Sequence, residues 1–128
     1  MIKSLIAFDT TSRESNLELI DWVRDYLDGF GIRSHLTFDD DKRKANLYAT
    51  AGPEDRGGVM LSGHTDVVPV DGQDWATDPF AVVEKDGRLY GRGTCDMKSF
   101  IAVALAHLPD FIERGLTTPL HLALSYDE

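Results

Sequence analysis

Residues 58–66, Gly-Val-Met-Leu-Ser-Gly-His-Thr-Asp, carry the strongest indication of the fold. A short apolar run bounded by glycines is typical of a strand that is buried on both faces, as in the centre of an α/β sheet. We therefore predict a strand over residues 58–62. Because ligands of open α/β sheets bind beyond the carboxyl ends of the strands, the polar residues that follow this strand become candidates for a functional site.

Amphipathic helices are predicted on both sides of this strand. Apolar residues recur at helical spacing over residues 17–30, after a capping-box pattern at residues 15–18 and before closing glycines. A second helix is predicted over residues 98–107. Pro109 is expected to kink this helix or to start a new turn over residues 110–114.

Short strands with turn signals between them complete the pattern. A Lys-Asp-Gly turn at residues 85–87 favours a hairpin. The further strand candidates are residues 33–38, 46–51, 80–84, 88–90 and 120–125. Helices and strands that alternate in this way indicate a layered α/β protein.

Composition excludes several classes of function. The chain has 128 residues and 14.2 kDa, about the size of one domain, and its net charge is −9. Such acidity disfavours nucleic acid, which needs clustered cations. The one basic cluster lies in residues 39–44, Asp-Asp-Asp-Lys-Arg-Lys, which we expect to form a solvated loop. No apolar stretch approaches the roughly 20 residues of a membrane span.

The single cysteine, Cys95, excludes an internal disulfide and a Cys-rich zinc site. A lone cysteine fits a reducing compartment, and the N-terminal apolar run is too short for a signal peptide. We therefore predict a cytoplasmic protein without nucleic-acid or membrane partners. Any metal in it must be held by His, Asp and Glu.

His64 and Asp66 follow the decisive strand two residues apart. In an extended chain, residues at this spacing point to the same side. A metal-bound histidine usually donates its other ring N–H to a carboxylate or carbonyl, which fixes its tautomer. The pair therefore suits a metal site. The alternative is a capped strand end with a solvent-facing histidine.

Two further segments place acids at a turn and at a strand end. Asp96 lies in a glycine-rich turn before the second helix, where it could also serve as an ordinary N-cap. That turn lacks the Gly-x-x-x-x-Gly-Lys-Ser/Thr spacing of a phosphate loop. Asp127 and Glu128 follow the last strand and are either simply solvated or suited to metal-assisted hydrolysis, in which a carboxylate accepts a proton from water.

Taken together, these segments resemble the M20 family of dinuclear-zinc aminoacyl hydrolases. The matching stretches are residues 62–69, 74–75, 78–80, 89–98 and 122–128. Gly-Thr-Cys-Asp-Met-Lys at residues 93–98 and Leu-Ser-Tyr-Asp-Glu at residues 124–128 most resemble the acetylornithine deacetylase branch, as do residues 8–17. The resemblance implies a three-layer α/β/α domain with a mixed, mostly parallel sheet.

The resemblance also implies a role for each site residue. His64 would bind one metal, Asp66 would orient His64, and Asp96 would bridge two metals. Glu128 would be the general base. The implied cofactor is a pair of Zn²⁺ ions, with Co²⁺ as a possible substitute, and the peptide bond from Asp96 to Met97 would be cis.

The implied reaction is hydrolysis of a small N-acyl amino acid, foremost N-acetylornithine to ornithine and acetate in arginine biosynthesis, by a homodimer. Another M20 hydrolase, such as a succinyl-diaminopimelate desuccinylase, an aminoacylase or a dipeptidase, is the alternative. Residues 1–128 are expected to be the N-terminal portion of the catalytic domain, without the dimerisation domain and the later ligands. A third possibility is accordingly a non-catalytic fragment.

Overall fold

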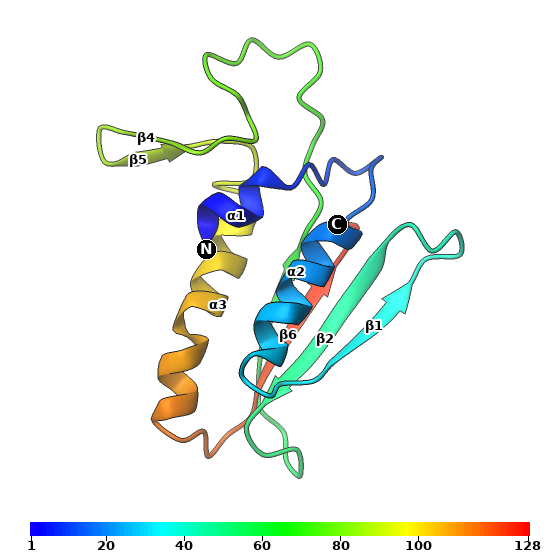
Figure 1. The fold of residues 1–128 in the computed structure, drawn as a ribbon, viewed down its shortest axis with the longest axis vertical. Coiled ribbons are helices and arrows are strands. Elements are labelled where there is room, and N and C mark those ends of the chain that lie inside the picture. The colour runs from blue at the N-terminus through cyan, green and yellow to red at the C-terminus, as the bar shows by residue number, and fades with distance from the viewer.

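A computed structural model describes residues 1–128, which form three helices and six strands (Figure 1). The helices are α1 (Ile2–Ala7), α2 (Leu17–Asp28) and α3 (Lys98–Glu113). The strands are β1 (Ser34–Phe38), β2 (Ala45–Ala51), β3 (Val59–His64), β4 (Val83–Lys85), β5 (Arg88–Tyr90) and β6 (Leu120–Ser125). All the predicted strands and both predicted helices are present, and α1 is an additional short helix.

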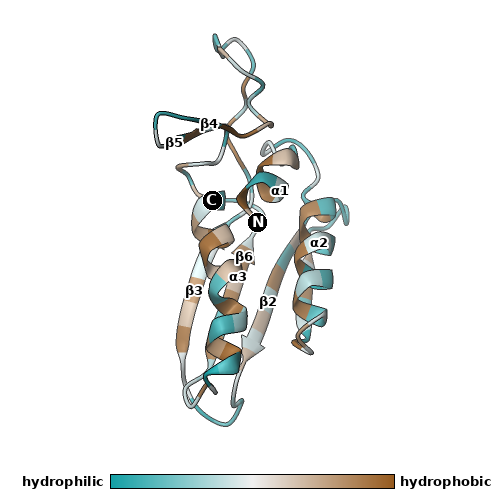
Figure 2. Cartoon of the chain, turned by 60° about the vertical axis from the view of Figure 1, so that its left-hand side comes forward, coloured by the Kyte–Doolittle hydropathy of each residue, from teal (hydrophilic) through white to brown (hydrophobic).

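The main sheet has the strand order β1-β2-β6-β3. Strand β6 is parallel to β3, whereas the β1–β2 and β2–β6 pairs are antiparallel. The predicted α/β class with a mixed sheet is confirmed, although the parallel pair is the minority within these residues. The β4–β5 hairpin forms a separate small sheet, and Figures 1 and 2 show it beyond the end of the main sheet at which α1 lies.

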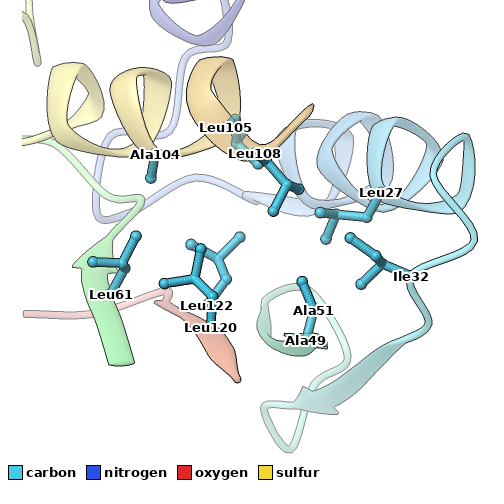
Figure 3. A pocket seen from close by; sticks show the side chains of 10 residues that line it. All are labelled: Leu27, Ile32, Ala49, Ala51, Leu61, Ala104, Leu105, Leu108, Leu120 and Leu122. Atoms are coloured by element: carbon cyan, nitrogen blue, oxygen red, sulfur yellow. The ribbon is translucent and has the colours of Figure 1, made fainter. Parts of the chain in front are cut away.

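Both long helices cover the same face of the main sheet. Alternate residues of β2 and β6 point towards them, as the burial of Leu47, Ala49 and Leu124 shows. The apolar junction of the two helices with the sheet (Figure 3) is lined by Leu27, Ile32, Ala49, Ala51, Leu61, Ala104, Leu105, Leu108, Leu120 and Leu122. The intervening residues, such as Tyr48, face the other way. The second helical layer of a three-layer domain is therefore not formed by residues 1–128.

Strand β3 is an edge strand, so the prediction that it is buried on both faces is wrong. It pairs only with β6, and the side chains of Val59 and Met60 are more than half exposed, at 56% and 54%. Gly63, in contrast to Val59 and Met60, is buried. A side chain at this position would meet Met97 and Ile101 at 3.1 and 3.2 Å. Its lack of a side chain lets α3 approach the end of the strand that leads into His64.

The predicted capping box at the start of α2 is also wrong. Asn16 is the N-cap residue, and its side chain makes no capping hydrogen bond. The Ser15 hydroxyl accepts a bond from the Leu17 amide at 3.2 Å, not from the Glu18 amide as a capping box requires. The Asn16 side chain instead accepts a hydrogen bond from the Ala45 amide and donates one to the Ala45 carbonyl, both at 2.9 Å. These bonds join the start of α2 to the start of β2. They also satisfy both polar atoms of the buried Asn16 side chain, as buried polar groups require.

Helix α3 runs through Pro109 as one helix, so the predicted alternative of a new turn over residues 110–114 is wrong. A proline within a helix removes the N–H that would bond the carbonyl four residues earlier, here that of Leu105. The Tyr26 hydroxyl of α2 donates to this carbonyl at 3.0 Å. Burial raises the pKa of Tyr26, so the phenol remains a donor. A contact from the neighbouring helix thus replaces the missing bond. None of the helices is long and apolar enough to cross a bilayer.

We expect Tyr26→Phe to lower the free energy of unfolding by about 1 kcal/mol, since it leaves the Leu105 carbonyl without a donor. In a Pro109→Ala background the loss should be smaller, because an alanine at this position would restore the backbone donor. Urea unfolding of the two single variants and the double variant measures both values. Equal losses in the two backgrounds would contradict this account of Pro109.

Candidate metal centre

The ends of three elements bring His64, Asp96 and Glu128 together. His64 ends β3, Glu128 follows β6, and Asp96 lies in the turn before α3. The register of the parallel pair sets His64 beside Ser125, so the chain leaves both strands at the same edge of the sheet. One ligand atom from each of the three residues lies within 4.8 Å of the others.

His64 points its Nε2 atom at the two acids. This atom lies 3.1 Å from Asp96 Oδ1 and 3.8 Å from Glu128 Oε2. The other ring nitrogen, Nδ1, lies 3.1 Å from both Asp66 Oδ1 and the Asp66 carbonyl oxygen. Because a carboxylate only accepts hydrogen bonds, Nδ1 is the donor to Asp66. The imidazole is 10% exposed, so the alternative of a solvent-facing histidine is wrong.

The surroundings of His64 favour its charged form. Burial by itself lowers the pKa of this imidazole. Hydrogen bonding to Asp96, together with the hydrogen bond and negative charge of Asp66, outweighs burial and raises the pKa above its usual range. The same negative surroundings would favour a bound cation, which is the electrostatic property that a metal site needs.

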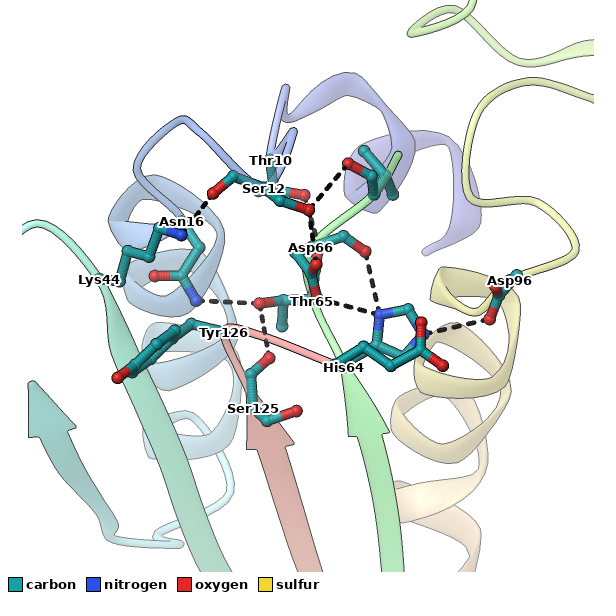
Figure 4. A network of polar contacts seen from close by, with 12 residues as sticks. Thr10, Ser12, Asn16, Lys44, His64, Thr65, Asp66, Asp96, Ser125 and Tyr126 are labelled. Carbon is teal, nitrogen blue, oxygen red and sulfur yellow. Dashed lines mark hydrogen bonds and ion pairs between the residues drawn. The ribbon is translucent and has the colours of Figure 1, made fainter. Parts of the chain in front are cut away.

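Asp96 is not the N-cap of α3, so that alternative is wrong as well. The N-cap is Met97, and no side-chain hydrogen bond caps the helix. The carboxylate of Asp96 is 70% exposed and extends towards His64 (Figure 4). The Asp96–Met97 peptide bond is cis, as the family resemblance implied. Gly93 in the same turn has a φ of +87°, and a side chain there would meet Val67 at 3.1 Å.

Lys98, the first residue of α3, connects this turn to the N-terminal segment. It is fully buried, and its ammonium group donates a hydrogen bond at 2.7 Å to the carbonyl of Phe8, the C-cap residue that follows α1. Burial lowers the pKa of Lys98 to about 8, and the charge of Asp9 opposes this shift. Sequence reasoning missed this role. The available signal was a cation in the first turn of a helix, where the helix dipole disfavours it.

The N-terminal loop is the second contribution that sequence reasoning missed. Thr10 and Ser12 pair with the backbone of Val67 on the segment after β3, through bonds of 3.0 and 3.1 Å. The Ser12 hydroxyl donates to Asp66 Oδ2 at 2.7 Å. In the sequence, residues 8–17 are a point of resemblance to one branch of the family, and that motif is the signal for this contact.

The donor set fits a divalent cation. His64 offers an imidazole nitrogen and Asp96 a carboxylate, ligands that suit Zn²⁺, Co²⁺ or Mn²⁺, and Glu128 places a second carboxylate beside them. The imidazole is held by a carboxylate on its far nitrogen, as is usual for metal-bound histidines. Two acids beside the imidazole would repel a phosphate group, so the geometry favours a cation.

In the metal-free protein we expect NMR titration to give His64 a pKa above its ordinary 6.5, and Asp96→Asn to lower it. Because the pKa is raised on folding, the stability that protonated His64 contributes is fully present below pH 6.5 and is lost as the pH rises through the raised value. An unchanged pKa in Asp96→Asn would show that the two side chains do not interact.

Curated relatives match nearly the whole chain. The acetylornithine deacetylase of Pasteurella multocida (strain Pm70) is 39% identical over 135 residues, which cover 100% of this chain and 35% of the relative. That of Proteus mirabilis (strain HI4320) is 40% identical over 126 residues, which cover 98% and 32%. The chain thus spans about a third of the length of these relatives.

Solved structures share the fold. Human carnosine dipeptidase 1 matches with a TM-score of 0.83 at 25% identity, over 96% of this chain and 30% of that one. The M20 family metallo-carboxypeptidase Sso-CP2 from Sulfolobus solfataricus has a TM-score of 0.82 at 19% identity, over 97% of this chain and 29% of its own. At that lower identity the likeness concerns the fold alone.

The family model described as Peptidase family M20/M25/M40 matches residues 60–128. This is more than half of the chain, and it contains all four residues for which the sequence predicted a role, namely His64, Asp66, Asp96 and Glu128. The chain therefore belongs to peptidase family M20/M25/M40.

Proposed function

We propose that residues 1–128 form the N-terminal portion of the catalytic domain of a metal-dependent deacetylase, which hydrolyses N-acetylornithine to ornithine and acetate in arginine biosynthesis. The observation that carries the proposal is the convergence of His64, Asp96 and Glu128. Identity to acetylornithine deacetylases along the whole chain supports the choice of substrate.

Each residue of the candidate site would have its own role in the reaction. His64 and Asp96 would hold one Zn²⁺, and Asp96 would reach a second. Asp66 keeps His64 in the tautomer that leaves Nε2 free for a metal. Glu128 would take a proton from the attacking water and later deliver it to the leaving amine. Bound zinc or its Co²⁺ substitute would polarise the acyl carbonyl and acidify water.

Residues 1–128 alone are proposed to be inactive. A catalytic zinc normally keeps about three protein ligands, whereas His64 and Asp96 supply two to one cation and Asp96 alone supplies one to the other. The missing ligands and a dimerisation domain would come from the rest of a longer, homodimeric enzyme. A cytoplasmic location belongs to this proposal, and the exposed, unpaired thiol of Cys95 supports it.

A second candidate function is peptide hydrolysis. The observation in its favour is the likeness to human carnosine dipeptidase 1, with a TM-score of 0.83. Aminoacylase and succinyl-diaminopimelate desuccinylase activities belong to the same group of alternatives. All would use the same metal centre, because the bond that is broken is an amide in each case.

The test is a comparison of substrates with the full-length protein that carries this chain. We expect kcat/KM for N-acetylornithine to exceed the values for N-succinyl-diaminopimelate, an N-acetyl amino acid with an apolar side chain, and a dipeptide. A chelator should abolish turnover, and Zn²⁺ or Co²⁺ should restore it. Faster turnover of any rival substrate would overturn the choice of N-acetylornithine.

Replacement of Glu128 separates a general base from a metal ligand. In the full-length protein, Glu128→Gln should lower kcat by about 100- to 10,000-fold, the usual contribution of a positioned base, with metal content unchanged. His64→Ala should lose metal and activity together. Metal analysis beside steady-state kinetics measures both. Loss of metal from Glu128→Gln would instead make Glu128 a ligand.

A further inference from the structure

We propose that Ser12 is a positioning residue of the metal centre, which holds one oxygen of Asp66 so that the other meets His64. Figure 4 shows these three side chains in a row, joined by dashed lines. The inference rests on the proposed function, because it concerns the same centre. It adds a residue from the N-terminal loop, 52 positions before His64 in the printed sequence, to the set that orients the imidazole.

The two oxygens of the Asp66 carboxylate have different partners. Oδ2 accepts a hydrogen bond from the Ser12 hydroxyl at 2.7 Å, and Oδ1 lies 3.1 Å from His64 Nδ1. The hydroxyl must be the donor, since an ionised carboxylate has no hydrogen to give. Rotation of the carboxylate would break one or both bonds. Ser12 therefore restricts the rotation that would release the imidazole.

Because Asp66 is buried, loss of its hydrogen bond from Ser12 would be costly. Asp66 is only 7% exposed, and Oδ2 has no other hydrogen-bond partner in the protein. A buried acceptor that loses its partner costs about 1–3 kcal/mol, more when it is charged. Without the Ser12 hydroxyl, Asp66 would lower this cost by turning or by admitting water, and either change would loosen its hold on His64.

The backbone amide and the backbone carbonyl of Ser12 are both hydrogen-bonded. Its amide donates to the Val67 carbonyl at 3.1 Å, and the Lys44 ammonium group donates to its carbonyl at 2.5 Å. Lys44 also lies 5.7 Å from the centre of the Tyr126 ring, two residues before Glu128. The basic cluster was predicted to be a solvated loop, and this prediction is wrong for Lys44, which joins the Ser12 loop to the end of β6.

The test compares Ser12→Ala with Ser15→Ala in the full-length protein. Ser15 is the matched control, because it lies in the same loop but its hydroxyl contacts only the Leu17 amide. Loss of a direct outer contact of a metal ligand weakens metal binding or activity by about 10–100-fold. Ser12 acts through one further residue, so we expect Zn²⁺ affinity to fall by about 3- to 10-fold in chelator competition. Ser15→Ala should leave it unchanged.

An Asp66→Ala background shows whether Ser12 acts through Asp66. There we expect Ser12→Ala to cause no further loss of Zn²⁺ affinity, because the carboxylate it positions is gone. An unchanged affinity in the single variant, or an equal loss in both backgrounds, would overturn the inference. The variant His64→Ala distinguishes a failure of the Ser12 inference from a failure of the proposed metal centre. If that variant keeps full Zn²⁺ affinity, the proposed metal centre itself fails, whatever Ser12 does.

Discussion

The site depends above all on the hydrogen bond between His64 Nδ1 and the Asp66 carboxylate. This bond settles which ring nitrogen faces Asp96 and Glu128, and so which atom is offered to a metal. It requires the chain after β3 to keep a fixed course. Thr65 secures that course, since both its amide and its hydroxyl donate to the Ser125 carbonyl, at 2.8 and 2.9 Å. The parallel pairing of β3 and β6 is thereby extended past its end into the site.

Packing and chemistry occupy different parts of this fold. The apolar contacts lie between α2, α3 and one face of the sheet, where burial stabilises the layers without regard to direction. The titratable groups of the candidate site lie at the edge where β3 and β6 end. Asp66 and Lys98 are held there by directional hydrogen bonds. Such bonds define positions that apolar packing alone leaves free.

Charge gives the site its preference for a cation. His64 is flanked by Asp66 on one nitrogen and by Asp96 on the other, and its pKa is raised despite burial. In the absence of a metal, a proton on the imidazole offsets part of this negative charge. A divalent cation would take over that role more fully, because it interacts with Asp96 and His64 at once. Acid should therefore compete with metal binding.

The local elements and the location of the site can be predicted from the amino-acid sequence. Helix periodicity placed Ile20, Val23 and Leu27 on one buried face. Strand ends marked His64 and Glu128, and a glycine-rich turn before a helix marked Asp96, because these signals are carried by neighbouring residues. The tertiary structure alone decided the exposed edge of β3, the continuity of α3 and the contacts of Asn16, Ser12 and Lys98. Their partners lie far along the chain: Tyr26 and Leu105 are 79 residues apart, Ser12 and Asp66 are 54, and Lys98 and Phe8 are 90. A hydrogen bond across such a separation forms only after the layers have packed, so a local pattern can mark one residue of the pair but does not identify its partner.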